Sequence, residues 1–111
     1  MDEGAFQVLA DATLRELMTA LDDDLGDLAD VDLGNGILTI ELESGAKYIV
    51  NKQSPNRQIW LASPTSGGWH FEHAGGDSSP SHWRATKGGT TLASLLADEL
   101  ARATGVELRL G

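Results

Sequence analysis

Cysteine is absent from this chain of 111 residues, and its absence excludes several functions at once. Disulfides, thiolate metal sites and cysteine nucleophiles all require a residue that the chain lacks. The absence also fits a reducing compartment. Long apolar runs are missing too, because no stretch approaches the roughly 20 residues that a membrane-spanning helix needs. We therefore expect no membrane partner.

The N-terminal segment lacks the marks of a targeting signal. The stretch MDEGAFQVLADATLREL is acidic, whereas a secretory signal begins with positive charge and a transit peptide is rich in arginine. These absences favour a bacterial cytoplasmic protein, or a mature mitochondrial protein whose presequence has been removed.

Basic residues are scarce in the first part of the chain. Residues 1–43 hold 12 of the 17 acids and one base, Arg15, whereas residues 44–111 hold five acids and seven bases. A surface with this excess of acids repels nucleic acid and anionic membranes, and it attracts cations or a basic partner. General solubility is the alternative explanation for the net charge of −9.

The hydrophobic pattern predicts one domain over residues 1–111, with a helix at each end. Apolar residues recur at steps of three and four over residues 3–24, and again from Leu92 to Ala103 before Gly105. Short alternating segments between them predict strands near residues 31–33, 37–43, 46–52, 57–63, 69–73 and 82–86. The tail alternates at Val106, Leu108 and Leu110, and we expect it to pack between the helices.

Short turns between strands force antiparallel pairing. Two amphipathic helices can then cover one face of the sheet, which predicts an α+β fold, a two-layer sandwich with about five to six antiparallel strands. The other face of the sheet would stay open to solvent, where a partner could dock.

Acidic residues cluster around the end of the first predicted helix. Asp22, Asp23 and Asp24 occupy the end where the helix dipole disfavours anions. Selection for stability alone would not place acids there, so the pattern indicates a functional site. Exposed carboxylates suit hard cations such as Ca²⁺, Mg²⁺, Mn²⁺ and iron, with modest affinity and weak selectivity. An EF-hand is excluded, because counting from Asp22 places Asp27 at position 6 and Leu33 at position 12.

The hairpin YIVNKQSPNRQIWLASP carries amides, cations and an indole where a simple turn would need none of them. Alternation places Val50, Ile59 and Leu61 toward the core, and it places Trp60 with neighbouring amides toward solvent. Tryptophan and arginine are the residue types that supply most interface energy. Alternatively, Pro55 and Asn56 only shape the turn and Trp60 only shields the sheet.

Together these residues resemble the frataxin family, including its bacterial CyaY branch. The resemblance extends from FQVLADATLREL to the final helix and is densest in GILTIELESGAKYIVNKQSPNRQIWLASPTSGGWHF. It implies the frataxin fold and a role in iron–sulfur cluster assembly, with weakly bound ferrous or ferric iron. It also implies binding to the cysteine desulfurase and scaffold complex, which family members activate in mitochondria and inhibit in bacteria. A monomer that iron can drive into oligomers is expected.

The resemblance and the acidic pattern together define two candidate sites. The candidate metal ligands are carboxylates of the first helix and the segment after it: Glu16, Asp22, Asp23, Asp24, Asp27, Asp30 and Asp32. The candidate partner-binding residues belong to the hairpin and the strand after it: Asn51, Lys52, Gln53, Asn56, Arg57, Gln58, Trp60 and His70.

The chain departs from the family pattern in two places. Thr19 and Ala20 replace a pair of glutamates that many bacterial relatives carry, so the acids are shifted toward the helix end. His70 stands near the place where mitochondrial relatives carry a base, and its charge depends on pH. His70 and His73 would face opposite sides of a strand, so no preformed histidine site is expected.

Two function classes stay open. The chain is either an iron carrier or sensor, or a regulator whose acids dock a basic partner while metal binding is incidental. No phosphate loop or nucleophile motif indicates an enzyme. The family resemblance alone implies a weak ferroxidase activity.

Overall fold

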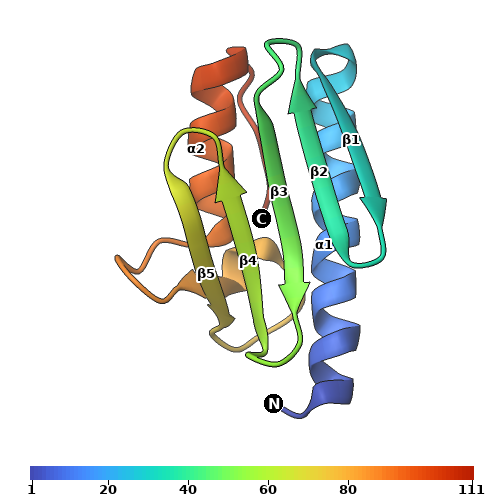
Figure 1. Ribbon diagram of the computed structural model, residues 1–111, viewed down its shortest axis with the longest axis vertical. Helices are drawn as coiled ribbons and strands as arrows, with labels where there is room; N and C mark the ends of the chain where they lie inside the picture. Colours follow the sequence, from blue (N-terminus) through green and yellow to red (C-terminus); the bar gives the residue numbers. More distant parts are fainter.

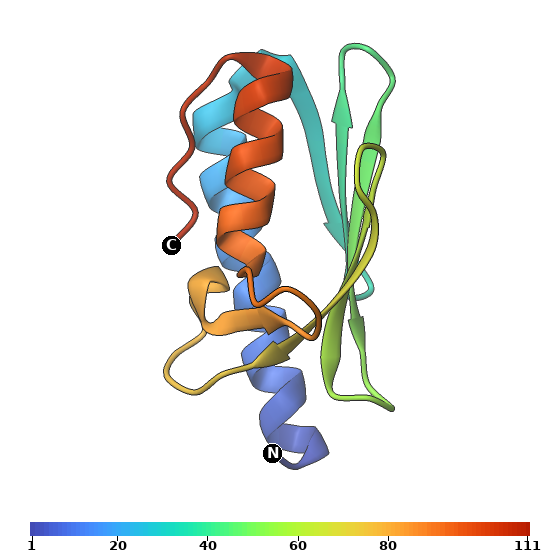
Figure 2. The same ribbon diagram turned by 90° about the vertical axis from the view of Figure 1, so that its left-hand side faces the viewer.

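The computed structural model describes residues 1–111 and shows two helices packed on one antiparallel sheet. Figure 1 shows the helices behind the sheet, and the side view of Figure 2 shows both on the same face of it. The two-layer α+β sandwich predicted above is therefore confirmed. In chain order the elements are α1 (Glu3–Leu25), η1 (Gly26–Leu28), β1 (Ala29–Gly34), β2 (Ile37–Leu42), β3 (Lys47–Gln53), β4 (Gln58–Ser63), β5 (Gly67–His73), η2 (Pro80–His82), β6 (Trp83–Ala85) and α2 (Leu92–Thr104).

Helix α1 begins and ends at residues that the sequence marks. The Asp2 carboxylate accepts a hydrogen bond from the Ala5 amide at 2.7 Å and caps the first turn. Gly26 ends the helix with a φ of 52°, a conformation that suits glycine, and its N–H bonds to the Asp22 carbonyl. Phe6, Leu14 and Leu21 lie on the buried face that packs against the sheet.

The sheet has six strands in sequence order, and each pairs antiparallel with the next. Asn35 and Gly36 join β1 to β2 with φ angles of 55° and 74°. Two positive φ angles in a two-residue loop suit a tight hairpin, for which Asn-Gly is the preferred pair. The register then places Asp32 opposite Thr39 and Asn51 opposite Trp60.

A single apolar core of 23 buried residues fills the space between the layers. Val50, Ile59 and Leu61 lie in it as the alternation predicted. Trp83 from the short strand β6 is fully buried, with its ring 6.1 Å from that of Phe6. No helix is both long and apolar enough to span a bilayer.

The structure changes two details of the expected pattern. Strand β5 begins at Gly67, so two residues expected between strands belong to the sheet. The segment between β5 and β6, where no element was expected, is held by hydrogen bonds and includes η2. The tail packs as expected, with Leu108 and Leu110 buried in the core cluster.

Candidate functional site

One end of the molecule is lined with carboxylates from three consecutive elements. Asp22 and Asp23 are exposed in the last turn of α1, Asp27 follows in η1, and Asp30 and Asp32 project to solvent from β1. In β1 they alternate with Val31 and Leu33, which are half-buried. These five exposed acids lie within eleven residues of the chain, between Asp22 and Asp32.

Two acids that the sequence reasoning missed, Glu41 in β2 and Glu43 in the turn after it, lie beside Asp30. Glu41 lies directly opposite Asp30 across β1 and β2, and Glu41 in turn lies opposite Lys47. Asp27, Asp30, Glu41 and Glu43 line an open groove of about 280 Å³. The alternation over residues 37–43 could have predicted that Glu41 faces outward, but its cross-strand neighbour depends on register. We call the surface formed by Asp22, Asp23, Asp27, Asp30, Asp32, Glu41 and Glu43 the acidic end.

Two predicted ligands lie away from the acidic end. A carboxylate oxygen of Asp24 accepts a hydrogen bond from the Arg109 amide at 3.2 Å, so this side chain faces the C-terminal tail. Glu16 accepts a hydrogen bond from the Ser78 hydroxyl of the segment between β5 and β6. No three acids or histidines lie close enough to enclose an ion. The acidic end is thus an open surface rather than a closed metal cage.

The open face of the sheet carries a row of aligned side chains. Ile37, Asn51, Trp60 and His70 lie opposite one another in register across β2, β3, β4 and β5. The rings of Trp60 and His70 stack with centroids 4.2 Å apart and planes 9° apart. We call Ile37, Ile49, Asn51, Gln58, Trp60 and His70 the open-face strip. Figure 2 shows that no helix covers this side of the sheet.

Hydrogen bonds along the strip fix its orientation. The Trp60 indole N–H donates to the Gln58 amide oxygen at 2.8 Å, and the Gln58 amide donates to Glu72 at 3.1 Å. Ile37 and Ile49 leave 45% and 37% of their surfaces exposed beside these groups. Flat apolar area framed by oriented amides is the composition of a protein-binding surface.

The two cations of the hairpin are held by the chain itself. Lys52 is two residues after Val50 in β3, so it points to the same face of the sheet, toward the helices. Its ammonium lies 2.7 Å from the Asp11 carboxylate of α1. Arg57 adopts a φ of 52° in the turn, and its guanidinium donates to the Ser54 carbonyl at 2.5 Å. Asn56 is exposed at the tip of this turn and Gln53 is half-buried. Lys52 therefore tethers the hairpin to α1 and lies off the open face.

The other two histidines lie beside the segment between β5 and β6. A ring nitrogen of His73 is 2.9 Å from the Asp77 carbonyl, and His82 Nδ1 is 2.9 Å from the Asp77 carboxylate. A hydrogen bond from the Ser79 amide lowers the pKa of Asp77, and the nearby His82 lowers it further. His70 faces the opposite side of β5 from His73, as predicted.

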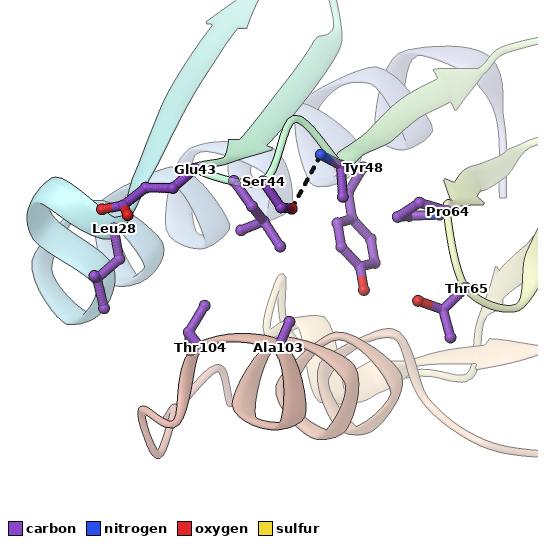
Figure 3. Close-up of a pocket in the computed structure, with 10 residues that line it drawn as sticks. Leu28, Glu43, Ser44, Tyr48, Pro64, Thr65, Ala103 and Thr104 are labelled. Atoms are coloured by element: carbon purple, nitrogen blue, oxygen red, sulfur yellow. Dashed lines mark hydrogen bonds between the residues drawn. The ribbon is translucent and has the colours of Figure 1, made fainter.

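A pocket of about 320 Å³ lies beside the last turn of α2 (Figure 3). Tyr48, Thr65 and Thr104 are among its lining residues. The Tyr48 hydroxyl donates to Glu99 at 3.0 Å, and the Ser44 hydroxyl accepts from the Ala46 amide at 3.3 Å. Because these polar groups already have partners within the chain, the pocket offers few free groups for a ligand.

Comparison with known proteins decides the family. The family model described as "Frataxin-like domain" matches residues 1–106. The chain belongs to the frataxin family. This frataxin-family chain is 36% identical over 99 residues to the iron-sulfur cluster assembly protein CyaY of Vibrio cholerae, covering 89% of the chain and 88% of that protein. It is 40% identical over 76 residues to the mitochondrial frataxin homolog of Saccharomyces cerevisiae.

The mitochondrial relatives are longer than this frataxin-family chain. The match covers 41% of the yeast protein, and a 36% match covers 59% of the mitochondrial frataxin of Arabidopsis thaliana. Among solved structures, frataxin from Psychromonas ingrahamii superposes with a TM-score of 0.84, over 100% of the chain and 99% of that protein. The sequence identity is 23%, so this comparison supports the fold. Trimeric yeast frataxin complexed with ferrous iron superposes with a TM-score of 0.72 at 35% identity, over 87% of the chain and 86% of that protein.

Proposed function

We propose that this protein takes part in iron–sulfur cluster assembly by carrying or sensing iron and by regulating the cysteine desulfurase and scaffold complex. The acidic end is the observation that carries the iron-binding part, because seven exposed carboxylates gather there from α1, η1, β1, β2 and the turn after β2. Relatives named for iron–sulfur cluster assembly and a relative complexed with ferrous iron support the role.

The charge arrangement supports a weak and exchangeable iron site. Asp30 and Glu41 are directly opposed in the sheet, and like charges in that position destabilise the fold. A bound cation relieves this repulsion. Hard carboxylate ligands suit both oxidation states of iron, and an open surface lets the ion leave. Such a site suits the transfer of iron rather than its storage.

The open-face strip is proposed as the surface that binds the desulfurase and scaffold complex. Trp60 offers a flat ring that is already oriented by Gln58 and stacked on His70, so little side-chain entropy is lost on binding. Asn56 is exposed at the tip of the hairpin, whereas the Arg57 guanidinium lies 3.8 Å from Glu3 of α1 and so faces the helix. Lys52 contributes indirectly, because its pair with Asp11 holds the hairpin in place.

An alternative function uses the same carboxylates without iron. The acidic end could dock a basic patch of the desulfurase, with metal binding incidental. The conflict between Asp22, Asp23 and the α1 dipole is explained equally well by that role. The two functions differ in whether iron bound at the acidic end is needed.

An anaerobic Fe²⁺ titration of the ¹⁵N-labelled protein tests whether the acidic end binds iron. We expect amide signals to broaden at residues 22–32 and 41–43, with modest affinity. Replacing Asp23, Asp27 and Asp30 with Asn should remove the response, whereas Asp98→Asn in α2 is the matched control and should not. No broadening at the acidic end, or broadening centred on His73 and His82, would favour the docking role.

A second variant tests the partner surface separately from iron. Trp60→Ala removes the centre of the strip but leaves every carboxylate of the acidic end in place. We expect it to bind Fe²⁺ normally and to lose affinity for the desulfurase and scaffold complex by at least tenfold. Unchanged affinity and unchanged desulfurase turnover would show that the strip is not the docking surface.

A further inference from the structure

The first half of β5 has a free edge. Strand β6 pairs only with Phe71, Glu72 and His73, whereas β4 pairs with β5 along its whole length from Gly67. Gly67, Gly68 and Trp69 therefore have a strand on one side only, since β6 pairs with none of them. A free edge is a template for pairing with another chain.

The backbone of Gly68 points toward that free edge. The Thr86 amide donates to the His70 carbonyl at 2.9 Å from the β6 side of the strand. In an antiparallel ladder, residues two apart direct their N–H and C=O groups to the same side. The N–H and C=O of Gly68 are therefore presented outward, where no neighbouring strand receives them.

Nothing within the chain requires a glycine at position 68. Its φ lies outside the positive region, in contrast to Gly67 with a φ of 84°, and a Cβ at Gly68 would meet no atom within 4 Å. Glycine inside a strand lowers stability relative to alanine. Such a glycine often marks a place where another backbone approaches closely.

One exposed base, Lys87, lies beside this edge and forms no ion pair, in a chain of net charge −9. Arg84 lies opposite Glu72 across β5 and β6, so Lys87 is the base whose charge is left for a partner. A shallow pocket of about 130 Å³ beside the edge is lined by Gly68, Trp69, His70, Thr86 and Lys87. The opposite edge of the sheet, β1, carries Asp30 and Asp32 instead. The β5 edge thus favours an acidic partner.

We propose that the free edge of β5 binds an extended, acidic peptide segment of a partner protein by strand addition. The segment pairs with the N–H and C=O of Gly68, and one of its carboxylates meets Lys87 over the shallow pocket. Alternating side chains of an added strand give such recognition its specificity. This surface contains none of the carboxylates of the acidic end, and it adjoins the open-face strip at His70, which stacks on Trp60.

The experiment begins with a random heptapeptide display library selected against the full chain. A synthetic peptide of the selected sequence is then titrated into the ¹⁵N-labelled protein. We expect acidic sequences rich in β-branched residues, with amide shifts at Gly67, Gly68, His70, Thr86 and Lys87. Gly68→Pro, which removes the outward N–H, should raise Kd at least tenfold. Gly68→Ala is the matched control, because it keeps the N–H, and its Kd should stay within twofold.

A second substitution keeps the test decisive if Gly68→Pro does not fold. Lys87→Glu changes an exposed side chain, so the fold should persist, and Kd for the acidic peptide should rise at least fivefold. Selection of no acidic sequences, shifts centred on the Trp60 face or the acidic end, or equal binding by Lys87→Glu would overturn the proposal. Self-association of the unliganded chain in light scattering would instead identify a second copy as the occupant.

Discussion

At the scale of single residues, Thr13 joins three parts of the fold. It is the one buried polar residue, and its hydroxyl accepts a hydrogen bond from the Trp83 indole at 2.9 Å. The hydroxyl also lies 2.7 Å from the Ser78 carbonyl, to which it can donate. The contacts connect α1 with β6 and with the segment before η2. In the sequence, Thr13 is simply one position in an apolar stripe.

Replacing Thr13 with valine should lower the free energy of unfolding by about 1–3 kcal/mol, because the buried indole N–H of Trp83 loses its acceptor. Urea unfolding followed by circular dichroism measures the change. Thr19→Val, at an exposed position of the same helix, is the matched control and should change stability by no more than about 0.5 kcal/mol. Equal effects would show that the hydrogen bond contributes little.

Tyr48 should make stability depend on pH in the alkaline range. Burial raises the pKa of its hydroxyl above the ordinary value of 10.0, and the adjacent Glu99 carboxylate raises it further. Above pH 10 the unfolded chain loses this proton before the folded chain does, so the free energy of unfolding falls as pH rises. Tyr48→Phe, although less stable at neutral pH, should show a smaller fall between pH 9 and 11.5. Parallel urea-midpoint curves for the two proteins would contradict this.

At the scale of elements, the charges at the C-terminal end of helix α1 interact unfavourably with the helix dipole, and those at its start interact favourably with it. The last turn contains acids and no base, whereas Asp2 and Glu3 stand at the N-terminal end, where the dipole favours anions. The helix persists because its apolar face is buried against the sheet. The acids at the far end therefore lower stability in return for a surface that attracts cations.

Replacing Asp22 or Asp23 with asparagine should raise stability by roughly 0.3–1 kcal/mol each at low salt, because an anion leaves the negative end of the dipole. Glu3→Gln at the other end of the same helix should lower stability. Thermal unfolding in 10 mM and in 1 M NaCl measures both effects, and salt should reduce both. A loss of stability in the asparagine variants would mean that these carboxylates make stabilising contacts.

At the scale of the whole molecule, charge is separated between two regions. The acidic end gathers carboxylates from α1, η1, β1 and β2, whereas residues 84–91 carry Arg84 and Lys87 and no acid. Because the chain carries a net charge of −9, repulsion within the acidic end opposes the folded state. Metal ions, salt or a basic partner can each reduce that repulsion.

Raising the ionic strength from 10 to 200 mM should therefore increase the melting temperature, since the Debye length falls from about 30 Å toward 8 Å. A variant with Asp23, Asp27 and Asp30 replaced by asparagine should melt higher at low salt and respond less to added salt. Differential scanning calorimetry of the two proteins measures the difference. An equal salt response in both would assign the effect to charges elsewhere.

The sequence by itself determined the elements and their order. Periods of two and of three to four residues, the Asn35-Gly36 turn and the glycine after each helix are local signals, and they sufficed for the α+β sandwich. The same alternation predicted that Val50, Ile59 and Leu61 are buried. The excess of acids in residues 1–43 likewise follows from the sequence alone.

Only the tertiary structure decided which side chains meet. Sheet register placed Glu41 opposite Asp30 and His70 against Trp60, and packing of α1 paired Lys52 with Asp11 and removed Glu16 from the acidic end. These contacts join residues far apart in the chain, so no local pattern encodes them. Their geometry depends on strand register and on where each helix lies over the sheet, which the packing of the whole core fixes.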